Sequence, residues 1–241
     1  SLSSISATPA LEARWLIQHV MGLTDAQVSL PSETRVPLPA QSACSEAVAR
    51  RLAGEPLALI LGTQGFWSLI LKVNADTLIP RPETEGLVEW LLSAFDAKTS
   101  LATERPLWHI DATDFSAAAL AVAKENARTY GLDGVHFLQG AWFAPVSFRA
   151  YDVIVSNPPY LANDDPHLPQ LSYEPETALV AGPTGLSALY DIIDQAPHYL
   201  RPGGCLVLEH GATQGDAVRS RLSSAGFMQI QQHSDLAGLP R

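Results

Sequence analysis

The sequence predicts an α/β protein in which a small helical domain precedes a doubly wound, mostly parallel sheet. After residue 83, short apolar runs typical of buried strands alternate with segments of helical periodicity. This alternation indicates parallel strands joined by helices. Before residue 57, only helical patterns occur. The chain has 241 residues, 46% of them hydrophobic, which is enough for two parts that each bury a core.

The first 59 residues form the expected helical domain. Helices are predicted over residues 9–21 and 42–52, with a short helix between them that opens at Thr24 or Asp25. Gly22 suits the left-handed end of the first helix. The apolar face of that helix is expected to consist of Leu11, Trp15, Ile17 and Val20.

The pattern changes between the two domains. Residues 57–78 predict two short strands or a hairpin, with Gly62 and Gly65 in turns. We therefore interpret residues 60–82 as a β-hairpin linker and residues 83–241 as the second domain.

The second domain contains the α/β alternation. Its predicted helices cover residues 83–95, 116–130, 186–200 and 214–225. Its predicted strands cover residues 108–114, 135–139, 151–156, 205–210 and 227–232, with a turn at 202–204.

One part of this alternation is missing. A nucleotide-binding sheet begins with a strand, a glycine-rich turn and a helix, yet no Gly-x-Gly occurs before Asp114. The helix that begins at residue 83 runs through Ser100 directly into Leu101, which resembles the tail of another helix. We predict that about 15–25 residues are omitted between Ser100 and Leu101, from ordinary element lengths.

Composition excludes several classes of protein. A net charge of -10 argues against a surface made for nucleic-acid phosphates. Cys44 and Cys205 are too few for a disulfide framework, and no metal site is expected. The sequence has no apolar run long enough for a membrane span and no signal-peptide pattern. A cytoplasmic location is expected.

The most informative stretch is Asn157-Pro158-Pro159-Tyr160. It follows the apolar run 151–156, and two successive prolines force the chain out of the sheet there. In open α/β sheets, ligands bind at this edge, where strands end. The tetrapeptide alone is equally consistent with a proline-rich turn that carries a packed tyrosine.

Four segments together resemble the HemK (PrmC) family. They are residues 50–57 (RRLAGEPL), 66–69 (FWSL), 78–85 (LIPRPETE) and 157–160 (NPPY). The resemblance implies a Rossmann-like class I methyltransferase that uses S-adenosyl-L-methionine and releases S-adenosyl-L-homocysteine. Its implied substrate is the GGQ-type glutamine of peptide chain release factors, methylated at the side-chain amide nitrogen.

The resemblance also implies roles for individual residues. Asn157, Pro158 and Tyr160 are the expected catalytic residues, and together with Pro159 they would contact the glutamine. Asp114 and Trp142 are expected to bind the cofactor with Asn157. Asp114 could instead cap a helix, and Trp142 could be a core residue.

Other positions leave questions open. Ala141 stands where the family usually has a carboxylate, which could weaken contact with the cofactor's adenine. Glu209 and His210 also end a strand at the ligand edge, and a site role cannot be separated from a packing role for them.

Two alternative functions remain open. An adenine-N6 methyltransferase acting on DNA or RNA could use the same motif on a flipped base. A non-catalytic binding module could retain the fold. For the leading function, we expect the helical domain to bind release factor, the chain to be a monomer, and no membrane or direct nucleic-acid binding.

Overall fold

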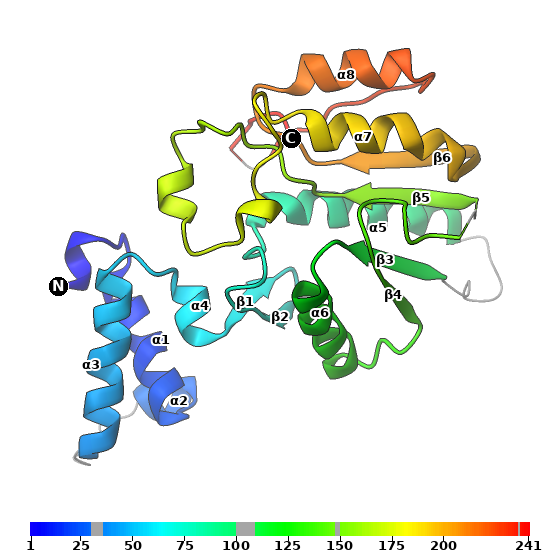
Figure 1. Cartoon of the computed structure of the whole chain (residues 1–241). Helices are drawn as coiled ribbons and strands as arrows, with labels where there is room; N and C mark the ends of the chain where they lie inside the picture. Colours follow the sequence, from blue (N-terminus) through cyan, green and yellow to red (C-terminus); the bar gives the residue numbers. More distant parts are fainter. Residues whose placement is uncertain (30–35, 100–108, 148–149, 236) are drawn as a thin grey trace.

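The computed structural model describes residues 1–29, 36–99, 109–147, 150–235 and 237–241 (Figure 1). The predicted omission between Ser100 and Leu101 lies outside the described residues. The helices, in chain order, are α1 (Pro9–Met21), α2 (Asp25–Ser29), α3 (Leu38–Leu52), α4 (Leu57–Leu61), α5 (Glu85–Thr99), α6 (Ala117–Thr129), α7 (Ser187–Gln195) and α8 (Gly215–Ser224). The strands are β1 (Thr63–Phe66), β2 (Leu69–Lys72), β3 (Ile110–Asp114), β4 (Val135–Gln139), β5 (Tyr151–Ser156) and β6 (Leu200–Leu208).

Helices α1 to α4 form an N-terminal unit with its own small core. Leu16 is 1% exposed and packs with Ala47 and Ile60. The apolar face predicted for α1 is largely wrong, because Leu11, Trp15 and Ile17 are exposed. Helices α3 and α4 contact α1 on the side of Leu16, and these neighbours decide which of several apolar positions become buried.

A hairpin joins this unit to the rest of the chain. Strands β1 and β2 pair antiparallel, as predicted, and residues 57–61, at the predicted change from helical to strand pattern, form α4. Pro56 precedes α4, and Gly62 ends it in the left-handed conformation. Gly65 lies within β1, and the turn falls at Trp67, which has a positive φ of 53°.

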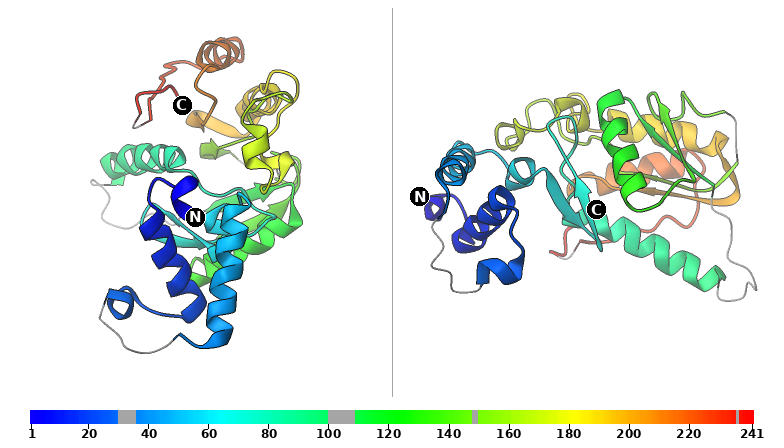
Figure 2. Two further views of the ribbon diagram at one scale, coloured as in Figure 1. Left: turned by 90° about the vertical axis from the view of Figure 1, so that its left-hand side faces the viewer. Right: turned by 90° about the horizontal axis from the view of Figure 1, so that it is seen from below.

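The hairpin is attached to α6 through side chains that bond to its backbone. The Tyr130 hydroxyl donates to the Ile70 carbonyl (2.8 Å) and accepts from the Ile70 N–H (2.7 Å). Asn126 makes the same pair of bonds with Lys72, at 2.8 and 3.0 Å. The views in Figures 1 and 2 agree that α1 to α3 lie to one side of the α/β part, with the hairpin between them.

The second part has the predicted parallel strands. Strand β3 pairs with β4, and β5 with β6, both in parallel. Helix α6 connects the first pair and α7 the second. Among the described residues, these are two separate two-stranded sheets rather than one continuous sheet.

Helix α7 contributes most of the core of this part. Its Leu189, Ile192 and Ile193 are at most 2% exposed, and they pack against β6 and α8. Strands β3 and β5 each have an apolar side chain that is not covered by other parts of the described chain. Ile110 of β3 is 46% exposed and Val155 of β5 is 42% exposed, although parallel strands are usually covered on both faces.

The clearest differences from the predicted elements lie after residue 186. The helix predicted over 186–200 ends at Gln195, because Pro197 follows in a short 3-10 turn. The turn predicted at 202–204 lies inside β6, where the register with β5 shifts. The strand predicted at 227–232 is absent; Phe227 packs against the clusters around α7, which accounts for its apolar character.

An ion pair between Glu12 and Arg51 links α1 to α3 within the N-terminal unit. Arg51 Nε donates to Glu12 Oε2 at 2.9 Å, and the two side chains are 17% and 11% exposed. The hydrogen bond from Arg51 holds the pKa of Glu12 below its ordinary value, against the opposing effect of burial.

Replacing Arg51 with methionine is expected to lower the free energy of unfolding by about 2 kcal/mol, because Glu12 would stay largely buried without its partner. The matched control is Arg50→Met in the same helix turn, which breaks a more exposed pair with Glu55. The control is expected to cost less than about 1 kcal/mol. Urea denaturation followed by circular dichroism measures both, and equal losses would contradict the assignment.

Candidate active site

The site lies where β5 and β6 end. Asn157-Pro158-Pro159-Tyr160 follows Ser156, the last residue of β5, and Ser156 pairs with Leu208 of β6. The Glu209 N–H donates to the Ser156 carbonyl at 3.0 Å, so the two chains leave the sheet together. The predicted position of the tetrapeptide at the carboxyl end of a parallel strand is confirmed.

A buried carboxylate organises this edge. Glu209 is 1% exposed, and it accepts hydrogen bonds from Thr84 Oγ1 (2.7 Å) and from the Tyr160 hydroxyl (3.1 Å). Thr84 belongs to a short 3-10 turn, Pro82–Thr84, that precedes α5. Burying a carboxylate is tolerable when donors surround it. Glu209 therefore connects three segments that are far apart in the sequence.

The same network sets the orientation of the Asn157 amide. Thr84 has one hydroxyl proton, and it gives that proton to Glu209. Its lone pairs are left to accept, and Asn157 Nδ2 donates to them at 3.0 Å. The Asn157 Oδ1 then faces away from Thr84, and no described residue donates to it. The amide oxygen is the part of Asn157 available to a bound molecule.

Tyr160 is held as a neutral phenol. Burial, followed by the charge and the hydrogen bond of Glu209, raises the pKa of Tyr160 to about 12. Its backbone is held as well, because Gln214 Nε2 donates to the Tyr160 carbonyl at 2.9 Å. Gly185 packs so closely that a Cβ there would lie 2.2 Å from the same carbonyl oxygen.

A small pocket opens beside the tetrapeptide. Its volume is about 160 Å³, which is below the 300 Å³ or more of sites for drug-sized ligands. It suits a single side chain better than a whole nucleoside. The lining comes from the tetrapeptide, the linker and the loop that follows, namely Leu78, Arg81, Asn157, Pro158, Pro159, Tyr160, Leu161, His167, Leu171, Ala178 and Leu179.

A second buried carboxylate supports one wall of this pocket. The Glu174 side chain is 1% exposed and forms an ion pair with Arg81. It also accepts from the Ile79 N–H at 2.8 Å. The linker and the loop after the tetrapeptide are thus held together at the pocket.

Asp114 and Trp142 lie at the ends of the other strand pair. Asp114 Oδ1 accepts from the Ser116 N–H at 2.7 Å, and Ser116 caps α6. The Asp114 side chain is exposed, and no described residue donates to its second oxygen. Trp142 has a positive φ of 48° and packs against the cluster around Phe143.

The structure therefore joins some predicted site residues and leaves others apart. Asn157 and Tyr160 share one network, and Pro158 and Pro159 line the same pocket. No hydrogen bond of the described residues links Asp114 or Trp142 to that network.

Sequence reasoning missed four supporting residues. Arg81 and Thr84 stood within the family-like segment 78–85, so that segment was the available signal. Glu209 ended a strand at the ligand edge, and Glu174 gave no signal beyond its place in the following loop.

Parallel strands joined by helices, with a polar network and a pocket at their carboxyl ends, are features of Rossmann-like α/β proteins, and the comparisons agree with that class. A family model for the PrmC N-terminal domain matches residues 1–62, and one for the methyltransferase small domain matches residues 98–170. The fold and these matches confirm the predicted class.

Similar proteins specify the family. The chain is 43% identical to the release factor glutamine methyltransferase of Coxiella burnetii over 256 residues, covering 100% of this chain and 92% of the relative. It is 40% identical to that of Pseudomonas aeruginosa, covering 98% and 92%, and 39% identical to that of Vibrio cholerae, covering 98% and 89%. The chain belongs to the release factor glutamine methyltransferase family, which confirms the resemblance predicted from its motifs.

The raised pKa of Tyr160 makes stability depend on alkaline pH. The unfolded chain ionises this phenol near pH 10 and the folded chain near 12, so the stabilisation is present below about pH 10 and lost as pH rises toward 12. The difference in the free energy of unfolding between the wild type and Tyr160→Phe should decrease by about 2 kcal/mol between pH 10 and pH 12. Urea denaturation across the series measures it. A constant difference would show that the phenol titrates normally.

The ion pair of Arg81 with Glu174 is expected to be costly to break. Arg81→Met should lower the free energy of unfolding by about 3 kcal/mol, because a buried carboxylate would lose its cation. Lys72→Met, which breaks an exposed pair with Glu125, is the control and should cost less than about 1 kcal/mol. A double-mutant cycle with Glu174→Gln isolates the coupling. Purely additive effects would contradict the pairing.

Proposed function

We propose that this protein transfers a methyl group from S-adenosyl-L-methionine to the side-chain amide nitrogen of a release-factor glutamine. One observation carries the proposal: the Asn157 amide is oriented through Thr84 so that its oxygen is free beside a pocket of side-chain size. The names of the relatives support the choice of substrate.

The residues of the pocket suit a glutamine amide as methyl acceptor. Such a nitrogen is a poor nucleophile because its lone pair is delocalised into the carbonyl. It is activated by acceptors that hold its two N–H groups so that the lone pair faces the methyl carbon. Asn157 Oδ1 and the Pro158 carbonyl are the proposed acceptors, since proline has no N–H to compete.

The other two residues of the tetrapeptide hold this arrangement. Tyr160 would pack against the planar amide, and Pro159 stiffens the backbone. Positioning is then the main catalytic contribution, because the amide need not be deprotonated before it attacks. As the methyl–sulfur bond breaks and the methyl–nitrogen bond forms, S-adenosyl-L-homocysteine is released and the nitrogen loses one proton to water. Glu209 contributes by fixing both Tyr160 and, through Thr84, Asn157.

Asp114 and Trp142 are proposed to hold the adenosine part of the cofactor. The second oxygen of Asp114 can accept from ribose hydroxyls, as carboxylates at this position do in dinucleotide folds. Trp142 would contact the adenine. When bound, the cofactor supplies an electrophilic methyl group on a sulfonium, and loss of charge at sulfur is favoured in a pocket of low polarity.

The glycine turn that would hold the rest of the cofactor is proposed to be missing between Ser100 and Leu101. Two observations support this. The alignment with the Coxiella relative spans 256 positions, 15 more than the 241 residues of this chain. In addition, the parallel strands form two separate pairs, with Ile110 and Val155 exposed on strands that a further strand could cover.

The helical domain, residues 1–59, is proposed to hold release factor beside the pocket. The Tyr173 hydroxyl donates to the Ala53 carbonyl at 3.3 Å, so the loop that includes Glu174 reaches the helical unit.

No helix among the described residues could cross a bilayer. A cytoplasmic, monomeric enzyme is proposed, and no observation specifically favours adenine methylation.

The test is a radiolabelled-methyl assay with release factor, a duplex oligonucleotide and ribosomal RNA in parallel. Label is expected in release factor alone. Asn157→Ala should reduce transfer to background while cofactor binding, measured by calorimetry, is largely retained. Transfer by Asn157→Ala at the wild-type rate would refute its role, and label in the nucleic acids would refute the substrate.

Peptide mass mapping decides how an inactive result is interpreted. A peptide that runs from Thr99 through Ser100 directly to Leu101, in a chain of 25.9 kDa, would mean that the glycine turn is absent. Inactivity would then support the non-catalytic binding module instead.

A further inference from the structure

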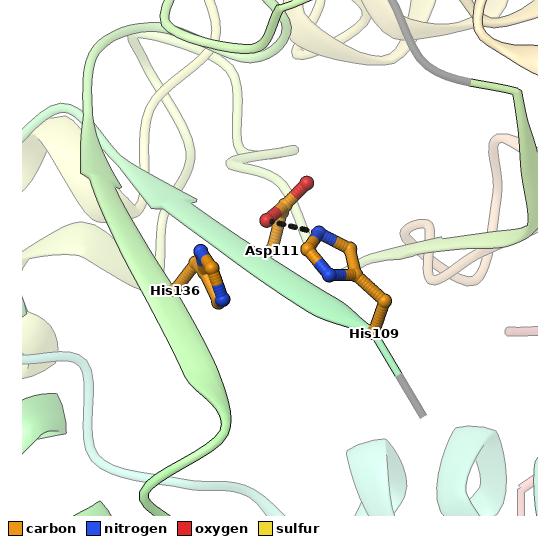
Figure 3. Close-up of side chains that lie close together, drawn as sticks. All are labelled: His109, Asp111 and His136. Carbon is orange, nitrogen blue, oxygen red and sulfur yellow. Dashed lines mark hydrogen bonds and ion pairs between the residues drawn. The ribbon is translucent and has the colours of Figure 1, made fainter. Parts of the chain in front are cut away.

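A group of metal-ligating side chains lies at the amino-terminal ends of β3 and β4, whereas the candidate active site lies at the carboxyl ends of β5 and β6. His109 and Asp111 flank the first residue of β3, and His136 is the second residue of β4 (Figure 3). Asp114, by contrast, ends β3. This group is separate from the groups proposed to bind cofactor or glutamine.

The parallel register brings the three side chains together. Asp111 pairs directly with His136, and His109 is two residues before Asp111, on the same face of the strand. The potential ligand atoms all lie within 4.8 Å of one another. His109 Nε2 is already 3.0 Å from Asp111 Oδ1, and the two imidazole centroids are 4.8 Å apart.

The carboxylate in this group is held in place by further contacts. The Asp111 side chain is only 6% exposed, and its Oδ2 accepts from the Tyr151 hydroxyl at the start of β5. Metal-binding carboxylates commonly have such a hydrogen bond to their second oxygen. Both histidines are exposed, while the carboxylate is largely buried and held by its partners.

We propose that His109, Asp111 and His136 bind a divalent transition ion, of which zinc is the best fit. Two imidazoles and one carboxylate suit zinc, whereas magnesium and calcium prefer oxygen ligands alone. Tetrahedral coordination with bonds of 2.0–2.1 Å needs ligand atoms about 3.4 Å apart. The ligand atoms already lie within 4.8 Å of one another, so side-chain rotation of the histidines would bring them to this spacing, and water would fill the fourth position.

The ion would act as a structural link. Among the described residues, the sheet of β3 and β4 has two strands, and its Ile110 is exposed. A metal bound by residues of both strands joins them, and the bond from Tyr151 to Asp111 connects them to β5. The proposal needs no methyl transfer and does not depend on the proposed function.

The experiment is calorimetric titration of the metal-free full chain with zinc chloride. One saturable site is expected. His109→Gln and His136→Gln should each weaken zinc binding by about 100-fold. Loss of an outer-shell partner costs up to that amount, and these histidines are proposed to be direct ligands. At a zinc concentration that saturates the wild type but lies well below the dissociation constant of His136→Gln, zinc should raise the thermal midpoint of the wild type and leave that of the variant nearly unchanged.

The matched control is His167→Gln. His167 Nδ1 also lies close to a carboxylate, 2.8 Å from Asp165, but that pair is not part of a three-residue cluster. Zinc affinity should be unchanged in this variant. Cobalt titration tests the coordination, because visible absorption of a four-coordinate ion should appear in the wild type and be lost in His136→Gln.

Two results would overturn the proposal. One is the absence of saturable zinc binding by a folded chain, which would leave His109 and Asp111 as a simple hydrogen-bonded pair. The other is equal zinc affinity in the wild type and in both histidine variants, which would place the metal elsewhere.

Discussion

The buried carboxylate of Glu209 is the group on which the arrangement of the candidate active site depends. An isolated buried charge would be very unfavourable, so donors must converge on it. The hydroxyls of Thr84 and Tyr160 meet this requirement, and Thr84 in turn accepts from Asn157. A single electrostatic requirement therefore positions the amide and the ring that are proposed to contact a substrate glutamine.

A similar requirement shapes the wall of the pocket. Glu174 is buried as well, and Arg81 and the Ile79 N–H satisfy it. Each carboxylate takes at least one partner from the proline-containing segment just before α5, because Thr84 donates to Glu209, and Arg81 and Ile79 pair with Glu174. This short segment therefore supplies partners to two buried carboxylates.

Several features could be predicted from the sequence because they depend on local chemistry. The paired prolines after β5 had to end a strand. The predicted strands that alternate with helices on either side of them pair in parallel. The predictions that failed concern features that depend on packing rather than on local chemistry. Phe227 owes its character to packing against α7. The buried face of α1 depended on where α3 and α4 lie.

The sequence by itself determined the α/β class, the family and the position of Asn157-Pro158-Pro159-Tyr160 at a strand end, because periodicity and proline act over a few residues. Only the tertiary structure decided which groups meet there. Thr84 and Glu209 are 125 residues apart, and their hydrogen bond forms only because the fold brings the turn before α5 to the end of β6. Likewise, Asp111 and His136 become neighbours only through the register of β3 and β4. Such contacts depend on the whole fold, since no local pattern specifies the partner of a buried charge.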